Sequence, residues 1–162
     1  MEPSLVIDDS LRSFLDSGVS LVIGTRDAAL VPEIVRAWGP RVSDDPRSVT
    51  VCVPLATSGK ARENLDQNGR IAATASLPTT YRTFQLKGRV IRISEPEAAD
   101  LAAVNRHRDA FGRVNRQIGV PREQVEAFWK RELVSSPSLV AVRFVVEAIF
   151  DQTPGPSAGA RL

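Results

Sequence analysis

The alternation of hydrophobic and polar residues along the chain predicts a mainly β fold. Runs that are rich in β-branched and apolar residues and are bounded by proline, glycine, aspartate or serine are typical of strands. Six such runs lie at residues 19–26, 30–42, 49–54, 70–77, 81–93 and 138–152. Because most are joined by short turns, and a parallel pair needs a long crossover, we expect an antiparallel sheet.

Apolar spacing, helix propensity and capping residues together predict four helices. They lie at residues 10–17, 60–69, 94–118 and 122–133. Asp8 and Asp9 are candidate N-caps of the first helix, and Pro121 opens the last. Ser94 is expected to begin the third, because "SEPE" has the capping-box pattern. Together these elements favour an α+β fold: a closed or nearly closed barrel of six antiparallel strands with flanking helices.

Length and composition indicate one globular domain. Of the 162 residues, 43% are hydrophobic and 25% are charged, which is near the average for globular proteins. We expect residues 1–152 to form the domain and residues 153–162 to form an irregular C-terminal tail.

Charge and cysteine content exclude several classes of protein. The net charge is only +2 and the arginines are scattered, so no nucleic-acid footprint is evident. Cys52 is the only cysteine and His107 the only histidine, which excludes an intrachain disulfide and a Cys/His zinc site. We expect Cys52 to pack in a strand and His107, between two arginines, to lie at the surface. The first residues do not resemble a signal peptide and no apolar run could span a membrane, so a cytoplasmic protein is expected.

The stretch "TSGK" at the start of the second predicted helix is a candidate anion site. Thr57 and Ser58 carry hydroxyls, Gly59 lets a ligand approach the backbone, and Lys60 adds a full charge. The amides of a helix N-terminus attract phosphate when the approach is open. The alternative is that Ser58 is an N-cap and Lys60 a solvated side chain, and these four residues alone leave both open.

A second candidate lies on the strand at residues 81–93. Thr83 and Gln85 share one face of this strand, two residues apart, where they can hydrogen-bond the edge of a flat heteroaromatic ring. The alternative is an ordinary solvent-facing strand surface.

Taken together, these residues resemble the pyridoxamine 5'-phosphate oxidase family of split barrels that bind flavin mononucleotide (FMN). The resemblance runs from about Phe14 to Ile93. It rests on the segments "EIVRAW", "SDDPRS", "VTVCVP", "TSGKARENLDQNGRIAATA" and "YRTFQLKGRVIRIS". It implies a six-stranded antiparallel split β-barrel with FMN as the cofactor.

The resemblance also implies roles for individual residues. Ser58 and Lys60 would bind the FMN phosphate, Arg36 would contact FMN, and Val53 would lie beside the ring. Trp38 either belongs to the core or covers the flavin.

Two positions depart from the family pattern. Gly59 replaces the arginine of the usual Ser-Arg-Lys-Ala, and Thr83 replaces a glutamine that touches the ring. Arg82 or Arg41 would then supply the missing charge. Arg41 also matches a basic residue for the substrate's phosphate, but the later substrate-binding cluster has no counterpart, so pyridoxamine phosphate is not the expected substrate.

Members of this family look like homodimers with cofactor sites between subunits. Four aromatic residues are candidates for that interface or for the intrachain core, namely Phe128, Trp129, Phe144 and Phe150. Lys87 or Arg82 would stabilise negative charge on the flavin. We therefore expect a dimeric flavin-dependent oxidoreductase with an unknown substrate and no assigned catalytic side chain. The alternatives are a non-catalytic flavin, deazaflavin or haem binding module, and a structural dimer without cofactor.

Overall fold

A computed structural model describes residues 5–130 and 139–162 of the chain. Its helices are α1 (Asp9–Leu15), α2 (Gly59–Asn68), α3 (Ala98–Gln117) and α4 (Arg122–Trp129). Its strands are β1 (Ser20–Arg26), β2 (Pro32–Arg36), β3 (Trp38–Val42), β4 (Ser48–Pro54), β5 (Arg70–Ser76), β6 (Thr83–Ser94), β7 (Leu139–Asp151) and β8 (Ala160–Arg161).

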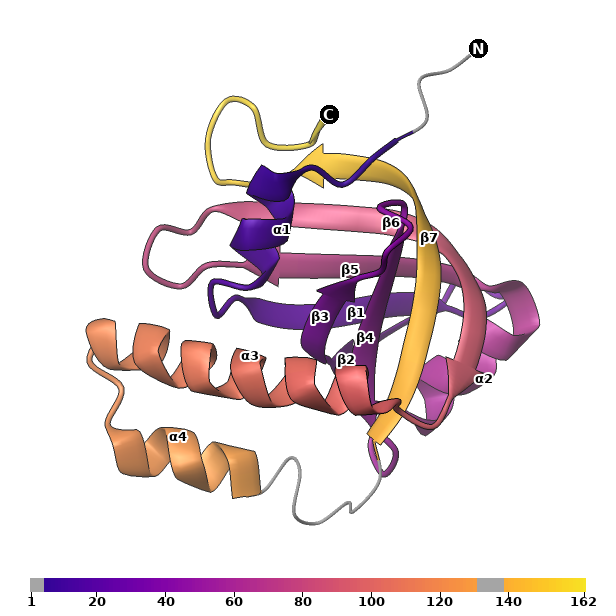
Figure 1. Cartoon of the computed structure of the whole chain (residues 1–162). Helices are drawn as coiled ribbons and strands as arrows, with labels where there is room; N and C mark the ends of the chain where they lie inside the picture. The colour runs from indigo at the N-terminus through magenta and orange to yellow at the C-terminus, as the bar shows by residue number, and fades with distance from the viewer. Residues whose placement is uncertain (1–4, 131–138) are drawn as a thin grey trace.

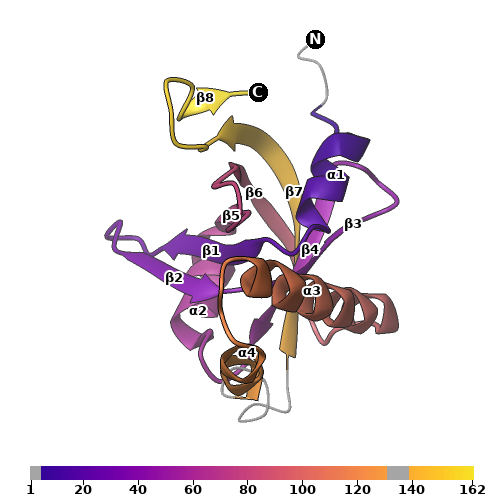
Figure 2. The same cartoon turned by 90° about the vertical axis from the view of Figure 1, so that its left-hand side faces the viewer.

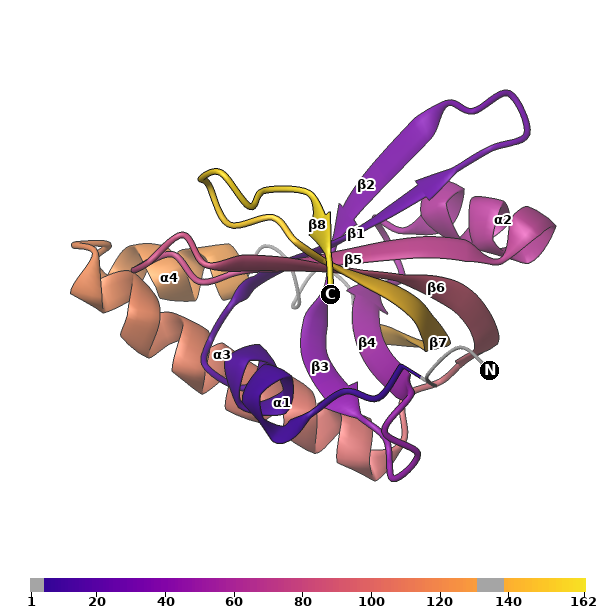
Figure 3. The ribbon, with the colours of Figure 1, turned by 90° about the horizontal axis from the view of Figure 1, so that it is seen from above.

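The strands form one antiparallel sheet in the order β2-β1-β5-β6-β7-β4-β3, with β8 paired to β7. The sheet curls into a split barrel, with α1 and α2 at opposite ends and α3 and α4 side by side along one flank (Figures 1 and 3). The predicted α+β split barrel is confirmed. None of the helices in the described ranges is both long and apolar enough to cross a membrane.

The sheet has eight strands, two more than predicted: the tail adds β8, and the run at residues 30–42 divides. Its first half pairs with β1 as β2, and its second half pairs with β4 as β3. The chain crosses from one end of the sheet to the other at Ala37, whose amide donates to the carbonyl of Leu21 at 3.0 Å. Gly39 then has a φ of +59°, and a Cβ there would lie 2.7 Å from the backbone of Val104. Glycine therefore allows α3 to pack directly on β3.

The barrel interior is filled by alternate residues of the strands, because the side chains of a strand point to opposite faces. Leu21, Ile23 and Leu86 are examples, each at most 1% exposed. Helix α1 closes the end of the barrel: its N-cap Asp8 accepts from the Leu11 amide, and Phe14 packs edge-on against Phe84 at 5.0 Å.

A second core joins α3 and α4 to the outside of β3. It consists of Trp38, Cys52, Val104, Phe111, Val125, Trp129 and Ala141. His107 belongs to this side of the molecule and is 4% exposed, so the expected surface position is wrong. Its Nδ1 accepts from the Gly39 amide at 3.0 Å and its Nε2 lies 2.7 Å from the Val19 carbonyl oxygen, which fixes α3 to β3 and to the start of β1.

The N-cap of α3 lies three residues later than predicted. It is Glu97, which forms a capping box with Asp100, whereas Ser94 is still paired with Ala141 in the sheet. The "SEPE" pattern was therefore misleading, because "EAAD" supplies an equivalent box once the strand has ended.

The C-terminal tail, expected to be irregular, contains β8. Phe150 pairs with Arg161, and the amide of Leu162 donates to the carbonyl of Ile149 at 2.9 Å. The predicted fourth helix is confirmed as α4 up to Trp129, and its last residues, 131–133, lie outside the described ranges.

Candidate functional site

Helix α2 begins without a side-chain cap. Ser58 occupies the N-cap position, but its hydroxyl makes no capping bond and instead accepts from Arg62 Nε at 3.1 Å. The first turn also contains no acidic residue. Ser58 is therefore the N-cap by position, without a side-chain capping bond, and it is fully buried. The free amides of this turn carry part of the helix dipole's positive charge.

The approach to this turn is open. A Cβ atom added at Gly59 would meet no other atom within 4 Å, and Thr57 beside it is exposed. Lys60 is half-exposed, with its Nζ 3.6 Å from an oxygen of Glu63. An exposed pair of this kind is worth little, so Lys60 can turn to a bound anion. These residues fit a phosphate group.

Arg62 is a residue that the sequence interpretation missed. Its Nε contacts Ser58, and its Nη2 is 3.4 Å from the Leu55 carbonyl oxygen. This places a guanidinium beside the start of α2, where the related pattern has its arginine at the Gly59 position. The signal was the spacing of four residues between Ser58 and Arg62, which puts both on one side of a helical turn.

Two asparagines attach α2 to the end of β1. Asn64, fully buried, donates to the Thr25 hydroxyl at 3.1 Å, and Asn68 donates to the Arg26 carbonyl at 2.8 Å. The start of α2 is therefore held in a fixed position relative to the sheet.

The outer face of β1, β5 and β6 forms a surface of small, half-exposed residues, here called the outer platform. It consists of Val22, Gly24, Ala72, Thr74 and Gln85. Val22, Thr74 and Gln85 are directly paired across the three strands, and Gly24 is paired with Ala72. These side chains lie on one face of the sheet, so a planar ring could contact several of them at once.

Three of the predicted site residues lie on or beside this platform. Arg36 pairs with Val22 and so lies three strand spacings from Gln85, about 14 Å. Thr83 and Gln85 face the same way, as predicted, and both already use polar groups within the sheet. Gln85 Nε2 donates to Thr74 at 3.1 Å, and the Thr83 hydroxyl is 2.7 Å from that of Ser76.

Arg36 also contacts the second core. Its guanidinium carbon lies 5.7 Å and 5.2 Å from the ring centres of Trp38 and Phe128, and its Nη1 donates to Ser20 at 3.2 Å. Trp38 is fully buried, with its ring centre 4.0 Å from that of Trp129. Within one chain Trp38 is therefore a core residue with no surface left for a flavin.

Val53 is also fully buried, in the barrel core. Of the interface candidates, Phe144 and Trp129 are buried within the chain, at 0% and 7% exposure. Phe150 is half-exposed on the face of Gln85, its strand partner, and Lys87 Nζ lies 4.7 Å from its ring centre.

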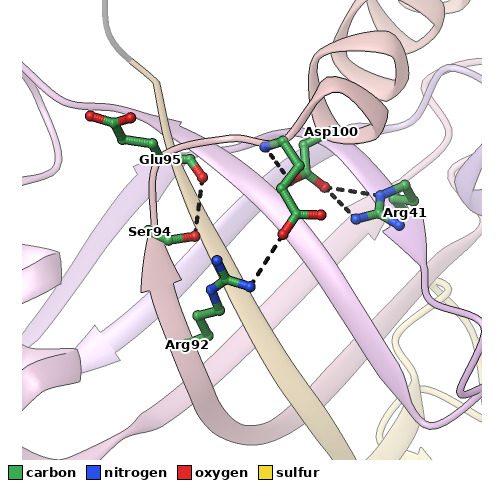
Figure 4. A network of polar contacts seen from close by, with 6 residues as sticks. Arg41, Arg92, Ser94, Glu95 and Asp100 are labelled. Atoms are coloured by element: carbon green, nitrogen blue, oxygen red, sulfur yellow. Dashed lines mark hydrogen bonds and ion pairs between the residues drawn. The ribbon is translucent and has the colours of Figure 1, made fainter.

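The two arginines expected to replace the missing charge lie elsewhere. Arg41 is bound through Nε and Nη2 to one oxygen of Asp100, at 2.9 and 2.6 Å, as Figure 4 shows. Arg82 lies over Phe14 and Phe84 at the α1 end, where it borders a hollow of about 990 Å³. Neither contacts the start of α2, so that expectation is replaced by Arg62.

Burial keeps the two remaining reactive groups inert. It lowers the pKa of His107 to about 4, so the imidazole is neutral near pH 7. It raises the pKa of the Cys52 thiol to about 12, which leaves no thiolate for redox chemistry.

Comparison with known proteins identifies the fold. No protein-family model matches the chain, and no curated protein matches it. HupZ of Group A Streptococcus is 19% identical, with a TM-score of 0.55 over 94% of this chain and 99% of HupZ. A candidate pyridoxamine 5'-phosphate oxidase from Lactobacillus delbrueckii is 14% identical, with a TM-score of 0.55 over 93% and 97%. An F420 reductase is 15% identical, with a TM-score of 0.55 over 85% and 94%. The chain therefore has the split-barrel fold of the pyridoxamine 5'-phosphate oxidase-like proteins.

Proposed function

We propose that the protein binds FMN, with the phosphate at the start of α2 and the ring on the outer platform. The observation that carries this proposal is the open first turn of α2. Helix α1 is capped by Asp8, α3 by Glu97 and Asp100, and α4 has Glu123 in its first turn. Only α2 among the described helices combines a start without a side-chain cap, no acidic residue in its first turn and open space at Gly59.

The roles of the residues follow from their positions. The amides of Gly59 and Lys60, with the Lys60 ammonium, would bind the phosphate. Arg36 and Gln85 would border the ring at opposite sides of the platform. Lys87 faces the same side of β6 as Gln85, so it replaces Arg82 as the candidate that stabilises negative charge near the ring.

We further propose an oxidoreductase activity. FMN, when bound, supplies hydride-accepting chemistry, and the protein supplies its position and its electrostatic surroundings. Reduction of the bound flavin by NADH or NADPH at a useful rate would support an enzyme. A flavin that stays oxidised with both donors would support the carrier alternative.

The second candidate ligand is the deazaflavin F420. The similarity in fold to an F420 reductase favours it over haem, and F420 also carries a phosphate for the start of α2. Absorption spectra and mass spectrometry of the ligand released from purified protein distinguish FMN, F420 and haem.

A homodimer is part of the proposal. The half-exposed platform offers a flat surface that a second copy can cover, with Phe150 at its edge. Sedimentation should give a dimer for the wild type, and Phe150→Glu should shift it towards monomer and weaken FMN binding. A wild-type monomer that binds FMN fully would contradict the shared site.

The direct test of the phosphate assignment is a titration of apoprotein with FMN. Lys60→Ala should weaken binding about tenfold, because a charge-assisted contact contributes about 1.5 kcal/mol or more. Lys130→Ala, at the end of α4, is the matched control and should bind as the wild type does. Equal FMN affinity in the Lys60 and Lys130 variants would remove the assignment.

A further inference from the structure

A second anion site is suggested by a hollow of about 350 Å³ between α3 and α4, which lie side by side in Figures 1 and 2. We call it the arginine hollow. Arg108, Arg113 and Arg116 border it from α3, and Arg122 and Trp129 border it from α4. It is formed by the helical flank, whereas the proposed FMN site is formed by α2 and the platform.

The charges around the hollow do not balance. Four arginines face two carboxylates, Asp109 and Glu126, which leaves a local charge of +2. Arg122 pairs with Glu126 at 2.7 Å, whereas the three arginines of α3 have no ion pair within the described ranges. Guanidinium groups that converge on a hollow match the oxygens of phosphate groups, which they bind in pairs.

The pKa of Glu126 is affected by the same positive charges. Its pKa is lowered by its hydrogen bond to Arg122 and by that residue's charge, and in addition by Lys130 and by Arg108. Arg108 belongs to α3, so the charges of the two helices act on one space.

An unpaired hydrogen-bond donor borders the same hollow. Trp129 is 7% exposed, and its buried Nε1–H has no acceptor among the described residues. A buried donor without an acceptor is unfavourable. A ligand oxygen within reach of this N–H would satisfy it.

The lining of the hollow also contains a glycine that packing does not require. A Cβ at Gly112 would make only an ordinary contact with Val125, at 3.9 Å. Glycine inside a helix is destabilising relative to alanine. At Gly112 it keeps the space between the helices open.

From these observations we propose that the arginine hollow binds a small molecule with two or three phosphate groups. The volume lies at the lower end of the range for small-molecule sites, about 300–1,000 Å³. The four arginines gather around one hollow rather than along a stripe, which favours a compact polyphosphate over an extended nucleic-acid backbone. This site goes beyond the proposed FMN function and does not depend on it.

Inorganic tripolyphosphate is the probe for the test, with the purified full-length protein. Binding is measured by calorimetry and by the NMR signals of the two indole N–H groups. The Trp129 signal should shift on addition of the probe. Arg113→Gln/Arg116→Gln should weaken binding about tenfold or more, whereas Arg26→Gln/Arg106→Gln, which removes the same charge outside the hollow, should not.

A variant that fills the hollow without changing its charge distinguishes a shaped binding site from a general electrostatic attraction. Gly112→Leu fills the hollow and keeps every arginine, so it should also weaken binding about tenfold while the protein stays folded. Equal loss in both arginine double variants, or an unmoved Trp129 signal, would overturn the proposal. Tighter binding of a single-stranded oligonucleotide than of tripolyphosphate, lost in the same variants, would also overturn it, since the surface would then serve a polymer.

Discussion

Helices α2 and α3 both begin where the sequence contains a capping residue, but their first turns differ. At α3 the chain supplies its own anions: Glu97 and Asp100 bond to the helix start, and Arg41 neutralises Asp100. At α2 the Ser58 hydroxyl is used by Arg62, and no acid follows. A helix start saturated by its own carboxylates stabilises the fold, whereas one that is left open can hold a ligand.

The largest expected effect on stability is at the start of α3, where the chain's own carboxylates bind the helix. Asp100 is 3% exposed and bonded to both Arg41 and the Glu97 amide. Asp100→Asn leaves Arg41 without its counterion and should lower the free energy of unfolding by about 3–5 kcal/mol, measured in urea. Asp66→Asn, exposed on α2, is the control and should change it by less than about 0.5 kcal/mol. A similar small change for Asp100→Asn would contradict this description of α3.

The second effect is a pH dependence of stability that comes from His107, on α3. The folded chain keeps His107 neutral until the pH nears 4, whereas the unfolded chain binds a proton from about pH 6.5. The stabilisation is thus complete above pH 6.5 and is lost as the pH falls through this range, by about 3 kcal/mol. His107→Gln should remove that part of the pH dependence in urea titrations. An unchanged slope between pH 6.5 and 4 in the variant would show that His107 is not the group responsible.

The smallest effect concerns Arg62 at the open start. Its guanidinium contacts Ser58 and would reach the phosphate only as a nearby charge. Arg62→Gln should weaken FMN binding about threefold, with a smaller salt dependence, and leave unfolding unchanged. Arg12→Gln, on α1 at the other end of the barrel, is the matched control. If both variants bind FMN like the wild type, Arg62 does not replace the missing arginine.

The strands and most helix boundaries were predictable because hydrophobic periodicity is local. The division at Ala37 was not, because residues 30–42 read as one continuous strand and the change of partner is a property of the whole sheet. His107 was misplaced because its arginine neighbours dominated the interpretation. Yet it lies at helical spacing from Val104 and Phe111, a signal that would have placed it in the core.

The candidate site was predictable only in part. The sequence locates Ser58, Gly59 and Lys60 at a helix start, because capping is local. It does not show that Ser58 is bound by Arg62, or that Arg41 is bound by an aspartate 59 residues away. Such pairings depend on tertiary contacts, and so does the register that builds the outer platform.

The most direct test introduces a carboxylate at the start of α2, like those at the start of α3. Gly59→Asp adds a side chain where no atom lies within 4 Å, so it should fit, and an acid in the first turn should leave stability unchanged or raise it. FMN affinity, measured by titration, should fall more than tenfold, whereas Gly59→Asn should bind nearly as the wild type does. FMN binding by folded Gly59→Asp at wild-type affinity would contradict the claim that the phosphate is held at the start of α2.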